Sequence, residues 1–187
     1  MTDALIDTER LRANVEQITA QLRANPAGGL IKPRVSTRLI RDVSAEATWT
    51  QFGREFSLRN DEASGRAGGG DAPTAIRYFL SGIAFCLQVW YAKGAALVGC
   101  EVEDIRLDLE ATFDMRVEYR LSRDEAVDER LLVEAWVISP SPRRTVIALA
   151  EEAHARCPLS TLVGRAIPIH RRLHHNGELV FEEPQVV

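Results

Sequence analysis

The sequence predicts an α+β domain in which antiparallel strands surround one long apolar helix. The longest apolar run lies between Ala72 and Ala95 and carries Cys86 in its middle. Short segments with β-branched and aromatic residues precede this run, and segments of alternating polarity follow it. With 187 residues, of which 45% are hydrophobic, the chain is long enough for one such domain with a sizeable core.

The charge of the chain argues against a nucleic-acid partner. The formal net charge is −4 and 27% of residues are charged, with the arginines scattered along the chain. The first residues lack a basic segment followed by an apolar core, so we expect a cytoplasmic protein. The central apolar run is interrupted by Ser81, Gly82, Gln88 and Lys93, which favours a core helix over a membrane span. We therefore expect no membrane partner.

The N-terminal segment predicts an amphipathic helix over Thr8–Asn25, ended by Pro26. Its apolar face carries Leu11, Val15, Ile18 and Leu22. We expect residues 1–28 to form this helix and a linker, and residues 29–187 to form the main domain.

Three short segments after the linker predict a meander of antiparallel strands: Arg34–Ile40, Ala45–Gln51 and Glu55–Arg59. The polar, glycine-rich stretch Asn60–Pro73 then predicts a loop that leads into the central helix. No Gly-Lys-Ser/Thr follows Gly70, so a plain turn is favoured over a phosphate-binding loop.

The central helix carries apolar side chains around most of its circumference, which predicts burial nearly all round. At 100° per residue, Cys86 projects about 180° away from Arg77. An activated Cys86 thiol would therefore need a cation from another segment or another subunit.

Beyond Gly94 the pattern predicts further strands, a charged turn at SRDEAVDER and a second helix. The strands are Glu101–Leu109, Ala111–Tyr119, Leu131–Ile138, Ile167–Ile169 and Leu179–Phe181, and the helix is Arg143–Arg156. The inward face of this helix, through Leu149 and Ala153, extends to Cys157. Because Pro158 disfavours helical dihedrals at Cys157, this thiol is expected at a helix break.

The order of these features resembles the OsmC/Ohr family. The matching pieces are AGGGDAPTAIRYFLSGIAFC, which ends at Cys86, and EEAHARCPLSTLV, which contains Cys157. The likeness runs from about Arg34 to Val163, so this chain is similar to a divergent OsmC-like member. It implies an OsmC-like fold with antiparallel sheets wrapped around a long buried central helix, in an intertwined homodimer.

The resemblance also implies a thiol-dependent peroxidase that reduces organic hydroperoxides or hydrogen peroxide. Cys86 would be the peroxidatic thiolate and Cys157 the resolving thiol, with a thiol or dithiol as reductant and no cofactor. An apolar pocket of aromatic and aliphatic side chains would favour a hydrophobic hydroperoxide. The residues expected to line it are Phe79, Ile83, Phe85, Trp90 and Tyr91.

One position departs from the family pattern. Peroxidatic members usually carry a glutamate ten residues before the first cysteine, where this chain has Ile76. The family's activating arginine lies near an early hairpin, where Arg41 is the nearest candidate and Arg38 or Arg54 are substitutes. Glu62 is the candidate replacement for the missing carboxylate.

The residues leave other interpretations open. A non-catalytic OsmC-like module that binds a small lipophilic molecule is the main alternative, with Cys86 as a packed core residue. A Cys-His acyl hydrolase would use Cys157 and His154. Cys100 is expected to be structural. His170, His174 and His175 are expected in a solvated segment, because Arg171 and Arg172 would repel a metal ion.

Overall fold

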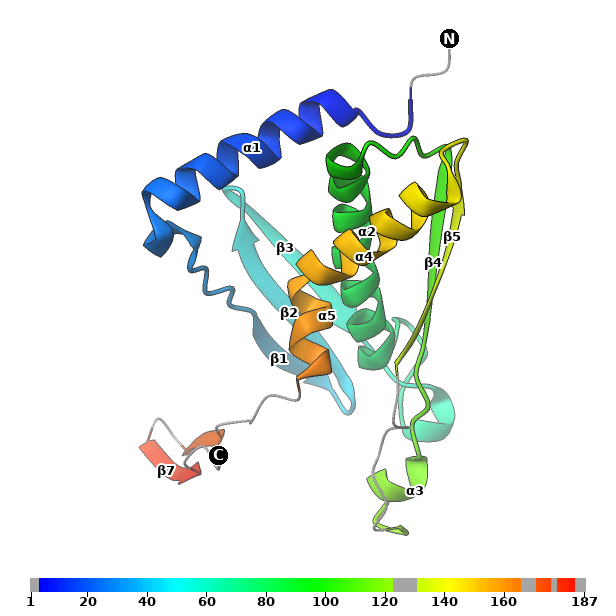
Figure 1. Cartoon of the computed structure of the whole chain (residues 1–187). Helices are drawn as coiled ribbons and strands as arrows, with labels where there is room; N and C mark the ends of the chain where they lie inside the picture. The colour runs from blue at the N-terminus through cyan, green and yellow to red at the C-terminus, as the bar shows by residue number, and fades with distance from the viewer. Residues whose placement is uncertain (1–3, 123–130, 166–170, 176–177, 184–187) are drawn as a thin grey trace.

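The computed structural model describes residues 4–122, 131–165, 171–175 and 178–183, the last two ranges by their backbone only. It is an α+β fold with antiparallel sheets and a long central helix, as predicted (Figure 1). In chain order the elements are α1 (Thr8–Ala24), η1 (Pro26–Gly29), β1 (Ser36–Arg41), β2 (Ser44–Gln51), β3 (Arg54–Asn60), η2 (Ser64–Arg66), α2 (Ala75–Val98), β4 (Asp104–Glu110), α3 (Met115–Glu118), β5 (Leu132–Ile138), α4 (Arg143–Arg156), α5 (Pro158–Gly164), β6 (Arg171–His175) and β7 (Glu178–Glu183).

The predicted meander is present as the antiparallel sheet β1-β2-β3. Trp49 of β2 pairs with Phe56 of β3, and their rings stack with centroids 5.9 Å apart. Glu46 in the middle strand accepts a hydrogen bond of 2.8 Å from Arg38 on β1. Residues of β1 and most of β3 are exposed, so this sheet projects away from the helical core.

The core lies where α2 meets α4, with the two-stranded β4–β5 sheet and α1 packed around α2 (Figure 1). Its fully buried side chains include Leu87 and Tyr91 of α2 and Leu149 of α4. Arg12 of α1 donates to the carbonyl oxygen of Ala96 at 2.9 Å, which holds α1 at the C-terminal end of α2. This contact satisfies a carbonyl that has no partner within the helix.

Within one chain, α2 is not buried nearly all round. Only one face of the helix is buried, through Ile83, Leu87 and Tyr91 and the turn that follows them. Phe79 and Phe85 are exposed, the latter to 70%. The sheet that precedes α2 in the sequence turns away and does not cover this second face (Figure 1). By length and composition alone α2 is also the one helix among the described residues that would suffice to cross a membrane.

The strand predicted over Ala111–Tyr119 is wrong, since this segment contains the short helix α3. Asp114 caps the helix by accepting a hydrogen bond of 2.8 Å from the Arg116 amide. The same carboxylate pairs with the Arg116 guanidinium at 2.7 Å. A local cap and ion pair at this spacing favour a helical turn over an extended strand.

The remaining predictions are partly confirmed. Helices α1 and α4 and strands β4, β5 and β7 follow their predicted segments within a few residues. Helix α5 and strand β6 were not predicted. The SRDEAVDER turn, apart from Ser122, and the Ile167–Ile169 strand lie outside the described residues.

We predict that Leu149→Ala lowers the free energy of unfolding by about 2–5 kcal/mol, because it leaves a cavity in the α2–α4 core. Leu149 is 0% exposed, whereas Ile147, two residues earlier on the same helix, is 49% exposed. Ile147→Ala is therefore the matched control, with an expected loss of about 0.5 kcal/mol. Urea unfolding at one fixed protein concentration measures both, and equal losses would contradict this location of the core.

Candidate functional site

The structure brings two of the three cysteines into direct contact. Cys86 lies on α2 and Cys157 lies between α4 and α5, 71 positions further along the chain. Their sulfur atoms are 3.2 Å apart, and both thiols are free. A disulfide bond has a sulfur–sulfur length of about 2.05 Å, so a shift of about 1 Å would allow the bond to form.

Cys157 occupies the predicted helix break. Its backbone is extended, with φ −74° and ψ 110°, because it ends α4 and also caps the first turn of α5. Pro158 begins α5, where a missing N–H costs nothing. The Cys157 sulfur accepts a hydrogen bond of 3.4 Å from the amide of Ser160. It is fully buried, in line with the inward face through Leu149 and Ala153.

The surroundings of the two thiols shift their pKa values in opposite directions. Burial raises the pKa of Cys86, the Leu159 amide opposes this effect, and the contact with Cys157 raises the pKa further. Burial would also raise the pKa of Cys157, but hydrogen bonds from the Ser160 hydroxyl and amide and from the Leu159 amide, together with the contact with Cys86, outweigh it. The net pKa of Cys157 is lowered. In this chain the negative charge of the pair is therefore favoured on Cys157.

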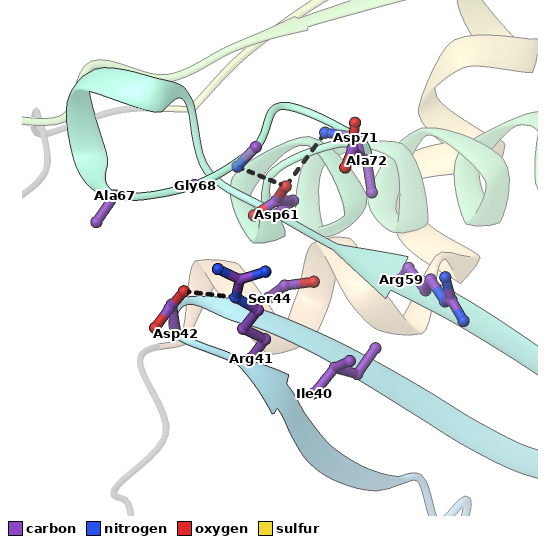
Figure 2. A pocket seen from close by; sticks show the side chains of 11 residues that line it. Ile40, Arg41, Asp42, Ser44, Arg59, Asp61, Ala67, Gly68, Asp71 and Ala72 are labelled. Carbon is purple, nitrogen blue, oxygen red and sulfur yellow. Dashed lines mark hydrogen bonds and ion pairs between the residues drawn. The ribbon is translucent and has the colours of Figure 1, made fainter.

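The loop before α2 is built around the buried carboxylate of Asp61. It accepts a hydrogen bond of 2.9 Å from the Glu62 amide. It also accepts hydrogen bonds from the amides of Gly69 at 2.9 Å and Asp71 at 3.2 Å, which Figure 2 shows as dashed lines. Gly68 is required here, because a Cβ atom at this position would lie 1.8 Å from the Glu62 carbonyl oxygen. The loop closes one side of a cavity of about 500 Å³, whose other side is formed by the β1–β2 turn.

Arg41, a predicted site residue, lines this cavity with Arg59 and Asp61. Its guanidinium Nε donates to the Asp42 carboxylate at 3.1 Å and is otherwise exposed (Figure 2). Glu62, the other candidate, pairs with Arg66 at 3.3 Å. Within the described residues no hydrogen bond or ion pair joins Arg41 or Glu62 to Cys86.

The other candidates lie elsewhere. Cys100 is buried, with its sulfur 3.7 Å from the Ser139 hydroxyl oxygen. His154 is exposed and presents its ring to Tyr91 with centroids 6.3 Å apart, while the Cys157 sulfur contacts Cys86 and Ser160. His170 and the side chains of His174 and His175 lie outside the described residues.

The predicted apolar pocket is wrong for this chain. Ile83 and Tyr91 are core residues, whereas Phe79 and Phe85 are exposed on α2. The ring of Trp90 lies under Lys93 and Arg156, at 5.2 and 5.7 Å from the ring centroid. A helical wheel shows the direction in which each side chain projects, but not whether another element covers it. The prediction therefore grouped side chains from the buried and the exposed faces.

Two residues that shape the site were not predicted. Ser160 contacts the Cys157 sulfur, and the Cys-Pro dipeptide that starts α5 was the signal that could have located it. Asp61 organises the loop, and an aspartate at the start of a glycine-rich turn is typical of this role.

Comparison with known proteins identifies the fold. The family model described as "OsmC-like protein" matches residues 68–171, which include both Cys86 and Cys157. The chain belongs to the OsmC-like family. A comparison with curated protein sequences gives no match.

Three solved structures have a similar OsmC-like fold. An OsmC-like protein from Mycoplasma pneumoniae has a TM-score of 0.56 at 13% identity, covering 73% of this chain and 89% of that one. A putative osmotic stress induced and detoxification response protein from Psychrobacter arcticus 273-4 has a TM-score of 0.54 at 12% identity, covering 71% and 88%. An organic hydroperoxide resistance protein OsmC from Legionella pneumophila has a TM-score of 0.54 at 18% identity, covering 72% and 90%.

We predict that Asp61→Asn lowers the melting temperature at pH 7, because an amide accepts the three backbone hydrogen bonds less well than a carboxylate. Hydrogen bonds from the Asp71 and Glu62 amides lead the effects that hold the pKa of Asp61 below its ordinary value. A carboxylate with a lowered pKa stabilises the fold above its unfolded pKa, and this contribution is lost as the pH falls through the folded pKa. The difference between wild type and variant should therefore shrink below about pH 4.

Melting temperatures measured from pH 3 to pH 7, a range of about four units around and above the ordinary aspartate pKa, test this prediction. Asp42→Asn is the control, since the Asp42 carboxylate pairs with Arg41 at the surface, where an ion pair contributes little. A difference between wild type and Asp61→Asn that stays constant with pH would contradict the role of the charged carboxylate.

Proposed function

We propose that this OsmC-like protein is a thiol-dependent peroxidase that reduces organic hydroperoxides or hydrogen peroxide. The Cys86 thiolate attacks the O–O bond, an alcohol or water leaves, and Cys86 becomes a sulfenic acid. The Cys157 thiol then attacks the Cys86 sulfur and expels water, which leaves a disulfide. Two thiol molecules, or one dithiol, supply the two electrons and two protons that reduce this disulfide.

The observation that carries the proposal is the 3.2 Å contact between the Cys86 and Cys157 sulfur atoms. Although they are distant in sequence, the two thiols lie close enough to form a disulfide without rearrangement of a helix. Cys86 is only partly buried, whereas Cys157 is fully buried, so a peroxide has access to Cys86. This asymmetry supports Cys86 as the residue that meets the substrate.

Activation of Cys86 requires a cation, and among the residues that the structure describes none acts on its thiol. Burial raises the pKa of Cys86, and a raised pKa disfavours the reactive thiolate. We propose that the Arg41 guanidinium from a second copy of the chain supplies the cation, with Glu62 as its carboxylate partner. The position of Arg41 on the exposed β1–β2 turn leaves it free for such a contact.

We propose that the functional unit is an intertwined homodimer. Its support is the apolar surface that one chain leaves uncovered, on the second face of α2 and on the projecting sheet. On the helix Phe85 is 70% exposed and Val89 is also exposed, and on the sheet Leu39 and Leu58 are exposed. Exposed apolar side chains that cluster on one helix face and one sheet are typical of a protein–protein contact.

The remaining expectations become part of the same proposal. We place the protein in the cytoplasm, where free thiols persist, with a peroxide substrate and a thiol reductant as its partners. Residues 1–28 would be an addition to the OsmC-like domain, which we propose spans residues 29–187. The family match begins at residue 68 and leaves the N-terminal helix outside it.

The alternative function is a binding module for a small lipophilic molecule. The raised pKa of Cys86 and the isoleucine at position 76 favour it over catalysis. The exposed phenylalanines of α2 would then contact the ligand. The cysteine variants below separate the two functions, because ligand binding needs no thiol.

We predict that Cys86→Ser lowers the rate of hydroperoxide consumption by about a thousandfold or more, since it removes the nucleophile. Cys157→Ser should retain one rapid turnover and then stop with a sulfenic acid on Cys86, which a dimedone-type probe labels. Peroxide assays and peptide mass spectrometry measure both. Cys100→Ser is the control and should keep the activity of the parent chain, because Cys100 contacts Ser139 and not the pair.

Peroxide consumption by Cys86→Ser at the parent rate would remove the peroxidase proposal. Absence of activity in the parent chain, together with a fatty acid bound in native mass spectra, would favour the binding module.

We predict that Arg41→Ala lowers peroxide consumption at pH 7 by about tenfold or more, because an adjacent cation lowers a thiol pKa by one to three units. Coexpression of Arg41→Ala with Cys86→Ser should restore activity, since each mixed dimer then has one site with an intact Cys86 and the partner's Arg41. Arg10→Ala is the control for loss of an exposed arginine, since Arg10 pairs with Asp7 on the surface of α1.

Activity of differently tagged, purified mixed dimers measures this restoration. A mixed dimer no more active than either variant alone would place the cation in the same chain as Cys86. A sedimentation mass equal to the 20.8 kDa of one chain, in place of twice that mass, would exclude the dimer itself.

A further inference from the structure

The two sulfur atoms of the site differ in their access to an external thiol. Cys157 is 0% exposed and is enclosed by its own chain, between α4, α5 and the core face of α2. Cys86 is partly exposed on α2. A second copy of the chain would not increase the exposure of Cys157. An external thiol therefore reaches a disulfide between these residues from the Cys86 side.

The two sulfurs also differ in how well each would leave. In thiol–disulfide exchange the sulfur that is not attacked departs as a thiolate, and a lower thiol pKa makes it leave faster. The Cys157 sulfur accepts a hydrogen bond of 3.4 Å from the Ser160 amide, and the Ser160 hydroxyl also stabilises its thiolate. Cys86 has only the Leu159 amide to oppose the effect of burial. The departing charge is therefore stabilised on Cys157.

We propose that the reducing thiol attacks the Cys86 sulfur of the Cys86–Cys157 disulfide, and that Cys157 leaves as a thiolate held by Ser160. This inference rests on the proposed function, and it assigns the two cysteines their roles in the reductive half of the cycle. Access and leaving ability both direct the attack to the Cys86 sulfur, so most of the mixed disulfide forms on Cys86.

With a dithiol as the reductant, the electrons balance in two exchanges. Its first thiolate forms a bond to the Cys86 sulfur as the sulfur–sulfur bond to Cys157 breaks. Its second thiol attacks the sulfur that the reductant has just placed on Cys86, and Cys86 departs. The dithiol is oxidised to its disulfide, and the protein regains both thiols with the two protons of the dithiol.

The site of the mixed disulfide tests this proposal directly. Tryptic cleavage places Cys86 in residues 78–93, Cys100 in residues 94–106 and Cys157 in residues 157–165, so each cysteine has its own peptide. The Cys100→Ser protein is oxidised with diamide, treated briefly with the monothiol glutathione, and quenched with acid and N-ethylmaleimide. We expect glutathione on Cys86 to exceed that on Cys157 by about tenfold or more, because the buried sulfur is not attacked.

Glutathione found equally on both cysteines, or mainly on Cys157, would overturn the proposal. Oxidation with diamide makes the test independent of peroxidase activity. If diamide forms the disulfide and a hydroperoxide does not, the proposed function fails while the site of attack is still measured. If neither oxidant forms it, both proposals fail.

Ser160→Ala tests the stabilisation of the leaving sulfur. It removes the hydroxyl and keeps the amide, so we expect reduction by dithiothreitol to slow about threefold to tenfold, with glutathione still on Cys86. Thiolate absorbance, followed against pH in a Cys86→Ser, Cys100→Ser background, should show a higher pKa for Cys157. Thr161→Val is the matched control, because the Thr161 hydroxyl donates to the Cys157 carbonyl oxygen at 3.1 Å and not to its sulfur. Equal reduction rates in the Ser160 and Thr161 variants would overturn the role of Ser160.

Discussion

The close packing of α4 against α2 is the contact on which the rest of the site depends. A Cβ atom on Gly94 would lie 3.1 Å from Leu149 Cδ1, so a glycine at this point lets the two helices approach. Cys86 lies eight residues before Gly94, and Cys157 lies eight residues after Leu149. About two turns of helix on each side therefore separate this contact from the sulfur pair. The same apolar burial that stabilises the domain determines the distance between the thiols.

The thiol pair is asymmetric because each cysteine occupies a different kind of backbone. Cys86 lies inside a long helix, whose own amides near the thiol are already bonded to carbonyls of the preceding turn, so the amide that reaches its sulfur is that of Leu159 on α5. Cys157 lies at a helix break, where the amides of the next turn have no backbone partner and are available to sulfur. This arrangement stabilises negative charge on the buried thiol and raises the pKa of the accessible thiol. Cys86 is thus the thiol that solvent molecules can contact, and Cys157 is the thiol whose negative charge is stabilised.

Sequence patterns correctly predicted the helices and the helix break that depend on interactions between neighbouring residues. Hydrophobic periodicity located α2 and α4, and Pro158 correctly predicted the break that faces Cys157 inward. The prediction failed at Ala111–Tyr119, where alternation favoured a strand but the Asp114–Arg116 cap and ion pair form α3. Ser160 was missed because its role comes from the turn that Pro158 begins. The contact between the sulfurs had no local signal, since only the packing of α2 on α4 creates it.

The predicted burial of α2 all round failed for a reason that bears on function. Periodicity reports that a face is apolar, but it does not report which chain covers that face. In one chain the face with Phe79 and Phe85 is exposed, and the β1-β2-β3 sheet projects away with Leu39 exposed. The Arg41 side chain lies on the same projecting sheet. If a second copy covers the exposed helix face with this sheet, one contact both buries the apolar surface and carries an arginine towards Cys86. Under the proposed dimer, the helix would need no glutamate at position 76 in its own chain, because Arg41 and Glu62 would both come from the other subunit.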